Sequence, residues 1–281
     1  MNQNNPLKQY FRQPAIYLRL PSQGNFYAPG AIEMPANNEL PIYPMTAIDE
    51  ITYRTPDALF NGSAVISVVQ SCCPAIKDPW AIPAVDVDSI LVGIRIATYG
   101  HEMEFESKCP HCGTTSDRTL DLRQVLDRMK APDYSQAVTY GDMQIFLRPM
   151  TYKNLNDNNQ RQFDEQKILN MLPDADVPEV QKMEALSAAL KKITEVTVHA
   201  LALSIATIKT PSAFVSEVEY IEDFLNNCDR TVFNQIRAKI IELKTQAEMQ
   251  PFEIQCTNEA CLKPYMQSIT LDMASFFEPA S

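Results

Sequence analysis

The sequence predicts an α+β protein in which proline-rich strands and short helices come first and two cysteine-bearing hairpins bracket a helical segment. Eleven of the 20 prolines fall before residue 84, all seven glycines fall at or before Gly141, and two pairs of cysteines stand near residues 110 and 260. Proline removes a backbone donor and favours turns and short strands. A glycine-free stretch can form long helices, since it avoids the backbone-entropy penalty of glycine.

The first 44 residues are expected to form an extended N-terminal arm with short strands. Ile16, Leu18 and Leu20 alternate with other side chains, which is the period of a half-buried strand. Residues 45–104 are expected to be helical. Thr55-Pro56 places a proline just inside a helix start, an apolar run then reaches position 72, and a second helix should end at Gly100.

Residues 126–249 are expected to form a hairpin followed by a helical insertion. The hairpin covers 138–147 and turns at Gly141-Asp142, and helical structure should then continue to about Met249. An apolar stripe at three- and four-residue spacing supports the helices. It consists of Met183, Leu186, Leu190, Ile193, Thr197, Leu201 and Ile205. Such a stripe serves either core packing or a partner surface, and core packing is favoured here.

The most informative short segment is Cys109-Pro110-His111-Cys112-Gly113. Two thiolates separated by two residues can bind one ion, and the glycine relieves strain in the tight turn. A structural zinc site has four ligands in a tetrahedron. Cys256 and Cys261 supply a second pair. We therefore predict one structural zinc per chain, bound by Cys109, Cys112, Cys256 and Cys261.

Similar residues flank the two cysteine pairs. Phe105-Glu106 precedes the first pair and Thr119-Leu120-Asp121-Leu122 follows it, while Phe252-Glu253 and Thr270-Leu271-Asp272-Met273 take these places around the second. Two strand–turn–strand units with two cysteines each make up a zinc ribbon. The ribbon would be split into residues 105–125 and 250–275 by the helical insertion.

Other interpretations of the cysteines stay open. The four thiols could be reduced and unliganded, or His111 could replace one of them as a ligand. A redox-active Cys109/Cys112 pair is disfavoured, because the βαβ context of such a pair is missing. The remaining cysteines are expected to be packed like small hydrophobic side chains: Cys72, Cys73 and Cys228.

Charge and composition favour protein partners. The net charge of −11 disfavours nucleic acid, which normally requires a basic face. No apolar run reaches the roughly 18 residues of a membrane span, and the Asn/Gln-rich start lacks the layout of a secretory signal. We expect synthesis in a reducing cytoplasm and no membrane contact. An enzyme is not expected either, because phosphate-binding glycine motifs are missing and four thiolates leave a zinc ion no open position.

Several segments resemble the T4-type bacteriophage baseplate hub subunits. They include Leu7-Lys-Gln-Tyr-Phe-Arg-Gln-Pro14, Ile16-Tyr-Leu-Arg-Leu-Pro21, Leu40-Pro-Ile-Tyr-Pro-Met-Thr46 and Thr55-Pro-Asp-Ala-Leu-Phe-Asn-Gly62. Ser71-Cys-Cys-Pro74 and the run from Asp88 to Gly100 continue the resemblance, which is strongest over about residues 7–125. The motifs are structural, so no catalytic residues come with them.

The resemblance implies a non-enzymatic structural part of the baseplate hub in a contractile tail. Such a protein would reside in the virion, within a hetero-oligomeric assembly of baseplate and tail proteins. The alternative is a tail-assembly chaperone that acts on the tape-measure protein and is absent from the mature virion. Aromatic and arginine side chains favour interfaces, so the arm offers four candidate partner-binding residues, unless its strand simply packs on its own domain. These are Tyr10, Phe11, Arg12 and Tyr17.

Overall fold

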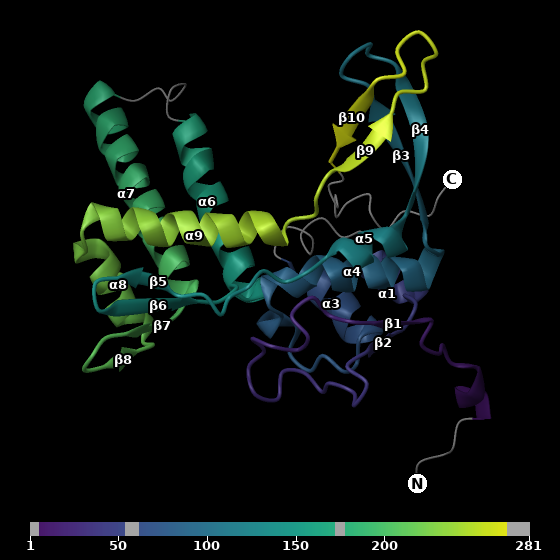
Figure 1. The fold of residues 1–281 in the computed structure, drawn as a ribbon, viewed down its shortest axis with the longest axis horizontal. Helices are drawn as coiled ribbons and strands as arrows, with labels where there is room; N and C mark the ends of the chain where they lie inside the picture. The colour runs from purple at the N-terminus through teal and green to yellow at the C-terminus, as the bar shows by residue number, and fades with distance from the viewer. Residues whose placement is uncertain (1–5, 54–61, 172–177, 269–281) are drawn as a thin grey trace. The chain divides into compact units, whose positions relative to one another are not determined.

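The computed structural model describes residues 6–53, 62–171 and 178–268 (Figure 1). The chain forms two compact units. Unit 1 consists of residues 1–79, 85–130 and 248–281, and unit 2 of residues 80–84 and 131–247. The fold is mixed α+β with small antiparallel sheets, which confirms the predicted class. Among the described residues, no helix is long and apolar enough to cross a membrane. The finer division into four sequence ranges stays a prediction.

Unit 1 begins with a 3-10 helix, a two-stranded antiparallel ribbon and helices. In chain order these are η1 (Pro6–Tyr10), β1 (Ile16–Leu18), β2 (Leu40–Ile42), α1 (Ala47–Tyr53), α3 (Ser63–Cys72) and, starting at the border of the unit, α4 (Ala84–Tyr99). The alternating strand and the helix that ends before Gly100 are confirmed. The helix start expected at Thr55-Pro56 lies outside the described residues.

Helix α4 is the centre of the core of unit 1. Ile90 and Ile94 are completely buried. At Gly93 the helix approaches the β1–β2 ribbon so closely that an added Cβ would lie 3.3 Å from Leu18. A larger side chain at Gly93 would therefore push the ribbon away from the helix.

A buried carboxyl group joins the first turn of α4 to the turn after β1. Asp86 is completely buried and accepts hydrogen bonds from the Ser22 hydroxyl and, at 2.8 Å, from the Ser22 backbone N–H. Burial disfavours the charged form and raises the pKa of Asp86 to about 6.

Arg12 attaches the N-terminal arm to the helices of unit 1. Its guanidinium donates to the Ser71 carbonyl and hydroxyl oxygens, both at 2.7 Å, and to the carbonyl of Pro44. It also lies 3.4 Å from the Asp49 carboxylate. Asp49 in turn accepts from the backbone N–H of Thr46 at 2.7 Å, the geometry of a capping box at the start of α1.

Unit 2 contains a four-stranded antiparallel sheet in the order β5-β6-β7-β8, with helices packed against it (Figure 1). Its elements are η2 (Pro79–Ala81), which begins one residue before the unit, β5 (Val138–Tyr140), β6 (Met143–Leu147), α6 (Tyr152–Met171), α7 (Glu179–Leu203), β7 (Ile205–Lys209), β8 (Phe214–Val215), α8 (Val218–Asn227) and α9 (Arg230–Ala247). The core lies between the sheet, the C-terminal half of α7, α8 and α9, with Ile145, Ile205, Ile221 and Ile236 completely buried.

Two predictions for this region need correction. Residues 205–209 and 214–215 form strands, not helix. Ile205 and Ile208 are buried in a strand that pairs with β6, and α7 ends before it at Leu203. The apolar stripe of α7 is also only partly core: Leu201 is buried, whereas Met183 is 68% exposed.

Candidate metal centre

The first cysteine pair lies at the turn of a regular hairpin. Strands β3 (Glu102–Lys108) and β4 (Thr115–Asp121) pair antiparallel along their whole length. Cys109 and Cys112 lie in the turn, which is closed by a 2.9 Å hydrogen bond from the backbone N–H of Gly113 to the carbonyl of Cys109. Gly113 has a φ of 74°, a left-handed conformation that glycine adopts without strain.

The second pair lies at the turn of a shorter hairpin. Strands β9 (Phe252–Gln255) and β10 (Pro264–Gln267) also pair antiparallel. The turn positions both cysteines through Asn258. The backbone N–H of Asn258 points at the Cys256 sulfur at 3.4 Å, and the backbone N–H of Cys261 donates to the Asn258 carbonyl at 2.8 Å.

The two turns bring all four predicted ligands together. The Sγ atoms of Cys109, Cys112, Cys256 and Cys261 all lie within 4.8 Å of one another. The sulfurs of Cys112 and Cys256 are 3.5 Å apart. A tetrahedral zinc with Zn–S bonds of about 2.3 Å separates its sulfurs by roughly 3.8 Å. The spacing therefore fits one tetrahedrally bound ion.

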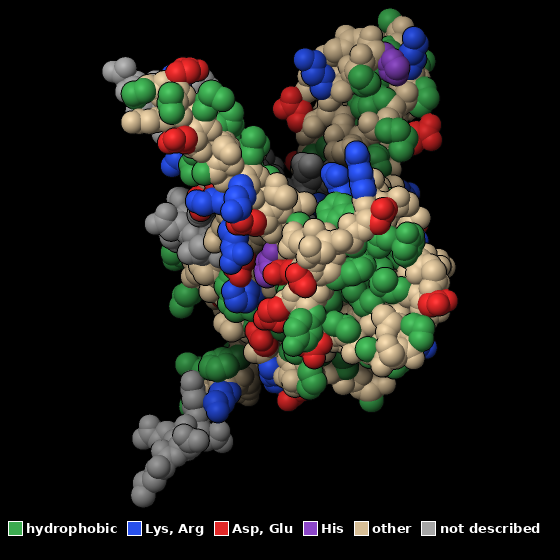
Figure 2. Space-filling model, turned by 90° about the vertical axis from the view of Figure 1, so that its left-hand side faces the viewer, with side chains coloured by type: hydrophobic (Ala, Val, Ile, Leu, Met, Phe, Trp, Pro, Cys, Tyr) green, Lys and Arg blue, Asp and Glu red, His purple; other side chains and the backbone are tan. Residues whose placement is uncertain are grey.

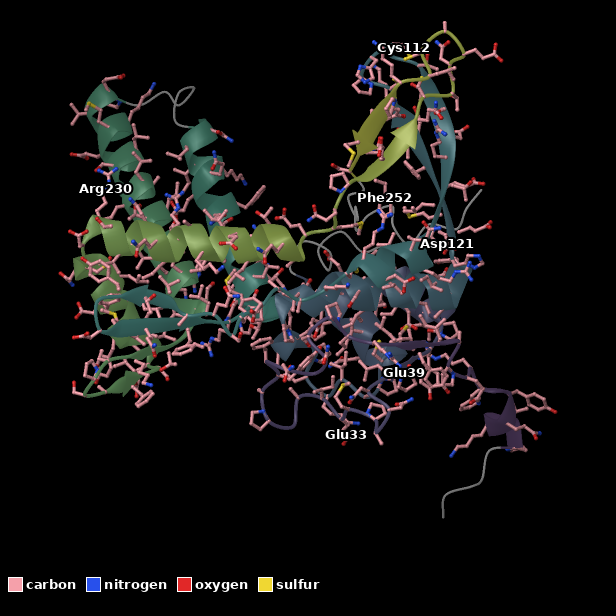
Figure 3. All side chains as sticks on the ribbon, viewed as in Figure 1. Glu33, Glu39, Cys112, Asp121, Arg230 and Phe252 are labelled. Carbon is pink, nitrogen blue, oxygen red and sulfur yellow. The ribbon has the colours of Figure 1, made fainter. Side chains whose placement is uncertain are left out.

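The cluster has one sheltered side and one open side. Cys109 and Cys256 are 1% and 3% exposed and pack against Tyr265. Cys112 is exposed at the end of the hairpin (Figure 3), and Cys261 is partly exposed. An ion bound here would be in contact with protein on one side and close to solvent on the other.

Polar contacts join the hairpins below the cysteines. The Ser107 hydroxyl lies 2.8 Å from the Tyr265 hydroxyl and donates to the Gln267 side chain at 2.7 Å. Nearer the sulfurs, the Asn258 side chain donates to the Thr114 hydroxyl at 3.1 Å. These side chains fix the two halves of the cluster relative to each other.

Two arginines add contacts along the same interface. The Arg118 guanidinium donates to the carbonyl of Gln255, in the opposite hairpin. Arg128, at the end of α5 (Leu122–Arg128), lies 4.4 Å from the ring centroid of Phe252, within the range of a cation–π contact.

The cluster stabilises one thiolate and disfavours several thiolates at once. Hydrogen bonds with the side chain and backbone of Thr114 lower the pKa of Cys112 to about 6. At Cys256 the Asn258 N–H acts to lower the pKa, but burial and the neighbouring thiols outweigh it and raise the value to about 12. Four thiolates so close together need a cation to offset their repulsion.

The donor set therefore fits a soft divalent ion such as zinc. Four cysteine sulfurs in a tetrahedral arrangement are typical of structural zinc. Among the described residues, the four cysteines are the one group of histidine, cysteine and acidic side chains with metal-binding spacing, and His111 is not part of it. Ligation itself, and the identity of the ion, stay predictions.

The residues that support the cysteine cluster were not predicted from the sequence. Ser107, Thr114 and Asn258 hold the hairpins together, and Tyr265 shelters the sulfurs. A signal was available: Ser107 and Tyr265 lie on strands that lead into or out of a cysteine turn, so alternation of the strand places them on the shared face. The flank Thr270 to Met273, used to recognise the repeat, lies outside the described residues.

The four candidate partner-binding residues have two different environments. Tyr10, Phe11 and Tyr17 are 77%, 54% and 62% exposed. Arg12 is bound by its own unit through Ser71 and the other contacts described above. Their role in partner binding stays a prediction, and only the three aromatic side chains are exposed for it.

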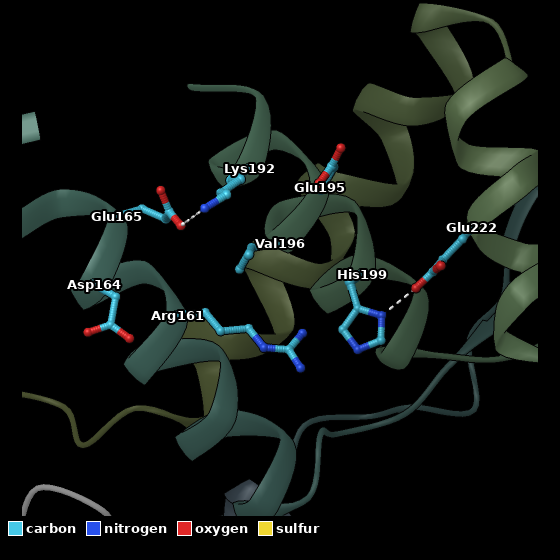
Figure 4. Close-up of a pocket in the computed structure, with 8 residues that line it drawn as sticks. All are labelled: Arg161, Asp164, Glu165, Lys192, Glu195, Val196, His199 and Glu222. Carbon is cyan, nitrogen blue, oxygen red and sulfur yellow. Dashed lines mark hydrogen bonds and ion pairs between the residues drawn. The ribbon is translucent and has the colours of Figure 1, made fainter. Parts of the chain in front are cut away.

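A charged cavity of about 410 Å³ lies in unit 2, between α6, α7 and α8 (Figure 4). Its charges are largely paired. Lys192 lies 3.4 Å from Glu165, and His199 contacts Glu222. His199 is therefore a partly exposed side chain that is hydrogen-bonded to Glu222.

Fold and site together define an α+β protein in which two hairpins from distant parts of the chain share one four-cysteine cluster. The family model described as "T4 bacteriophage base plate protein" matches residues 42–278. This chain belongs to that family. No curated protein and no solved structure matches it.

The family match extends the resemblance seen in the sequence. It starts at residue 42, after most of the N-terminal arm, and runs through the helical insertion and both cysteine pairs. The chain is thus a phage baseplate protein. Membership implies a place in the phage tail and contacts with other tail components, and it suggests a structural role.

Proposed function

We propose that this chain is a non-enzymatic structural component of the baseplate hub of a contractile tail, folded around one zinc ion. The observation that carries the proposal is the convergence of four cysteine sulfurs within 4.8 Å. A full thiolate set leaves a bound ion no position for substrate or water. The ion would then hold the two hairpins together instead of doing chemistry.

Contacts with other tail proteins are assigned to the N-terminal arm. Three aromatic side chains, Tyr10, Phe11 and Tyr17, are exposed while Arg12 fixes the chain between them. Exposed aromatic residues next to an anchored backbone are common interface anchors, because little conformational entropy is lost when they bind.

Quantitative mass spectrometry of purified virions tests the role. A structural component is present in a fixed ratio to other baseplate proteins. Presence in infected-cell lysate with absence from virions would instead support the chaperone that acts on the tape-measure protein.

Replacing Tyr10 and Phe11 together by alanine tests the arm. We expect less of the variant in virions and an unchanged melting temperature, since both side chains are exposed. Replacing Tyr140, an exposed aromatic residue of unit 2, by alanine is the matched control. Equal incorporation of all three proteins would contradict the assignment of the arm.

A further inference from the structure

The four cysteines of the cluster differ in how easily a reagent in solution can reach them. Cys109 and Cys256 are buried, Cys261 is partly exposed, and Cys112 is exposed. Cys112 lies in the turn at the end of its hairpin (Figure 3). Figure 2 shows this end, at the upper right, standing clear of the helices of unit 1 on the face that it draws. A small oxidant therefore meets the Cys112 sulfur first, because oxidation of cysteine follows exposure.

A sulfur that faces Cys112 within the cluster belongs to the other hairpin. The Sγ atoms of Cys112 and Cys256 lie 3.5 Å apart, although 144 positions separate the two residues in the chain. A disulfide bond between two sulfurs is about 2.05 Å long, so an approach of roughly 1.5 Å would join them. Cys256 is thus placed to react with an oxidised Cys112.

Polar contacts hold these two sulfurs against each other. The backbone N–H of Asn258 points at the Cys256 sulfur at 3.4 Å, and the side-chain amide of Asn258 lies 4.0 Å from the Cys112 sulfur. The Cys112 thiol also donates to the Thr114 hydroxyl at 3.3 Å, and the Asn258 amide donates to the same hydroxyl at 3.1 Å. Asn258 therefore positions both members of the pair.

We propose that Cys112 and Cys256 are a peroxide-sensitive pair that oxidation converts into a disulfide between the two hairpins. The Cys112 thiol takes one oxygen atom from hydrogen peroxide, becomes a sulfenic acid and releases water. The Cys256 thiol then attacks the oxidised sulfur, so that the S–S bond forms, the S–O bond breaks and a second water leaves with the thiol proton. Two electrons pass from the sulfurs to the peroxide. From metal-bound thiolates, the two protons come from solvent.

The disulfide changes how the hairpins are joined. It uses two of the four ligands, so a zinc ion bound to the cluster is released, while Cys109 and Cys261 keep their thiols. A reducing cytoplasm keeps such a pair reduced, whereas disulfides persist in an oxidising medium. The cluster thus joins the hairpins through an ion in one medium and through a disulfide in the other. This inference rests on the four-cysteine cluster of the proposed function, but it requires neither the hub role nor bound zinc.

Treatment of the full-length protein, as purified, with hydrogen peroxide tests the proposal. Metal content is measured first, and a chelating dye reports zinc release during oxidation. Free thiols are then blocked with N-ethylmaleimide, and mass spectrometry of unreduced peptides locates the disulfide. We expect a bond between Cys112 and Cys256, N-ethylmaleimide on Cys109 and Cys261, loss of bound zinc in step with the bond, and reversal by dithiothreitol.

Two ligand variants form a matched pair. Cys112→Ser and Cys261→Ser each remove one sulfur from the cluster and should both weaken metal binding. The first should abolish the cross-link between the hairpins and the second should retain it. Cys228→Ser, outside the cluster, should leave both zinc content and cross-link unchanged.

A disulfide formed mainly within one turn, between Cys109 and Cys112, would overturn the proposal. So would oxidation of Cys112 to sulfinic acid without a disulfide, and so would earlier oxidation of Cys228. Failure of the proposed function gives a different result: a zinc-free wild type that still forms the cross-link would contradict the zinc site and support this inference. Zinc-loaded protein that forms no cross-link would do the reverse.

Discussion

The hydroxyl groups of Ser107 and Tyr265 lie 2.8 Å apart although 158 positions separate them in the chain. The contact joins the two cysteine hairpins directly below the sulfurs. It is made by protein atoms alone, so the hairpins have an affinity for each other that adds to any metal bonds.

Removing this contact should weaken the association of the two cysteine hairpins. Tyr265→Phe deletes one buried hydroxyl and leaves Ser107 with only its bond to Gln267, so we expect a loss of about 1 kcal/mol in unfolding free energy. Urea titration measures it. Ser107→Ala and the double variant complete a mutant cycle, and strict additivity would show that the two hydroxyls do not interact in solution.

The cysteine cluster should bind about one zinc per chain, as four thiolate ligands predict. Cys256→Ser should remove most of the metal, measured by mass spectrometry of metal content in reduced protein, and should lower the melting temperature. Cys228→Ser is the matched control, because Cys228 is a partly buried cysteine outside the cluster. A zinc-free wild type, purified with zinc present, would refute the site.

Arg12 should contribute more to the free energy of unfolding than a partly exposed side chain usually does. Arg12→Ala removes two 2.7 Å bonds to Ser71 and leaves Asp49 without its cation. We expect a loss of roughly 1.5–3 kcal/mol, the range for hydrogen bonds to charged groups.

Arg19→Ala is the control for Arg12, because Arg19 forms an exposed ion pair with Glu39. Exposed pairs of this kind contribute about 0–1 kcal/mol. Comparable effects of the two substitutions in urea titrations would show that Arg12 is not an anchor.

The buried Asp86 predicts a pH dependence with a defined sign. Its folded pKa of about 6 lies above the ordinary value, so the protonated carboxyl is favoured in the fold. The stability from this group is fully present below pH of about 4 and is lost as pH rises toward 6, a change of about 3 kcal/mol.

Unfolding free energies at pH 4 and pH 8 measure this effect, with Asp86→Asn as reference, because the amide does not titrate. The wild type should lose stability relative to the variant as pH rises. The opposite trend would mean that the hydrogen bonds from Ser22 outweigh the burial.

The cysteine cluster was predictable because its signals are local. Spacing, the glycine after Cys112 and the repeated flanks together indicated two similar turns, and the chemistry of zinc required four ligands. The residues that align the turns, such as Asn258 and Thr114, carry no comparable signal. Their role depends on a contact between hairpins that pattern analysis of either segment alone does not reveal.

The strands β7 and β8 were missed for a physical reason. Ile205 continues the three- and four-residue spacing of the apolar side chains of α7. A single apolar position at the end of that stripe is compatible with the period of a helix and with the period of a strand. What decides the structure is the neighbouring strand β6, whose edge can pair with residues 205–209. The exposure of Met183 was not predicted for a similar reason, because periodicity identifies an apolar face of a helix but not what covers that face.

The separation of the two cysteine pairs also has a consequence in time. Cys256 follows Cys112 by 144 positions. A ribosome adding roughly 5–20 residues per second needs about 7 to 29 seconds to cover that distance. During this interval the first hairpin has emerged with half a binding site, while unit 2 can already fold. The two hairpins can therefore join only after the second cysteine pair has been made, so a chain cut short before Cys256 cannot complete the cluster.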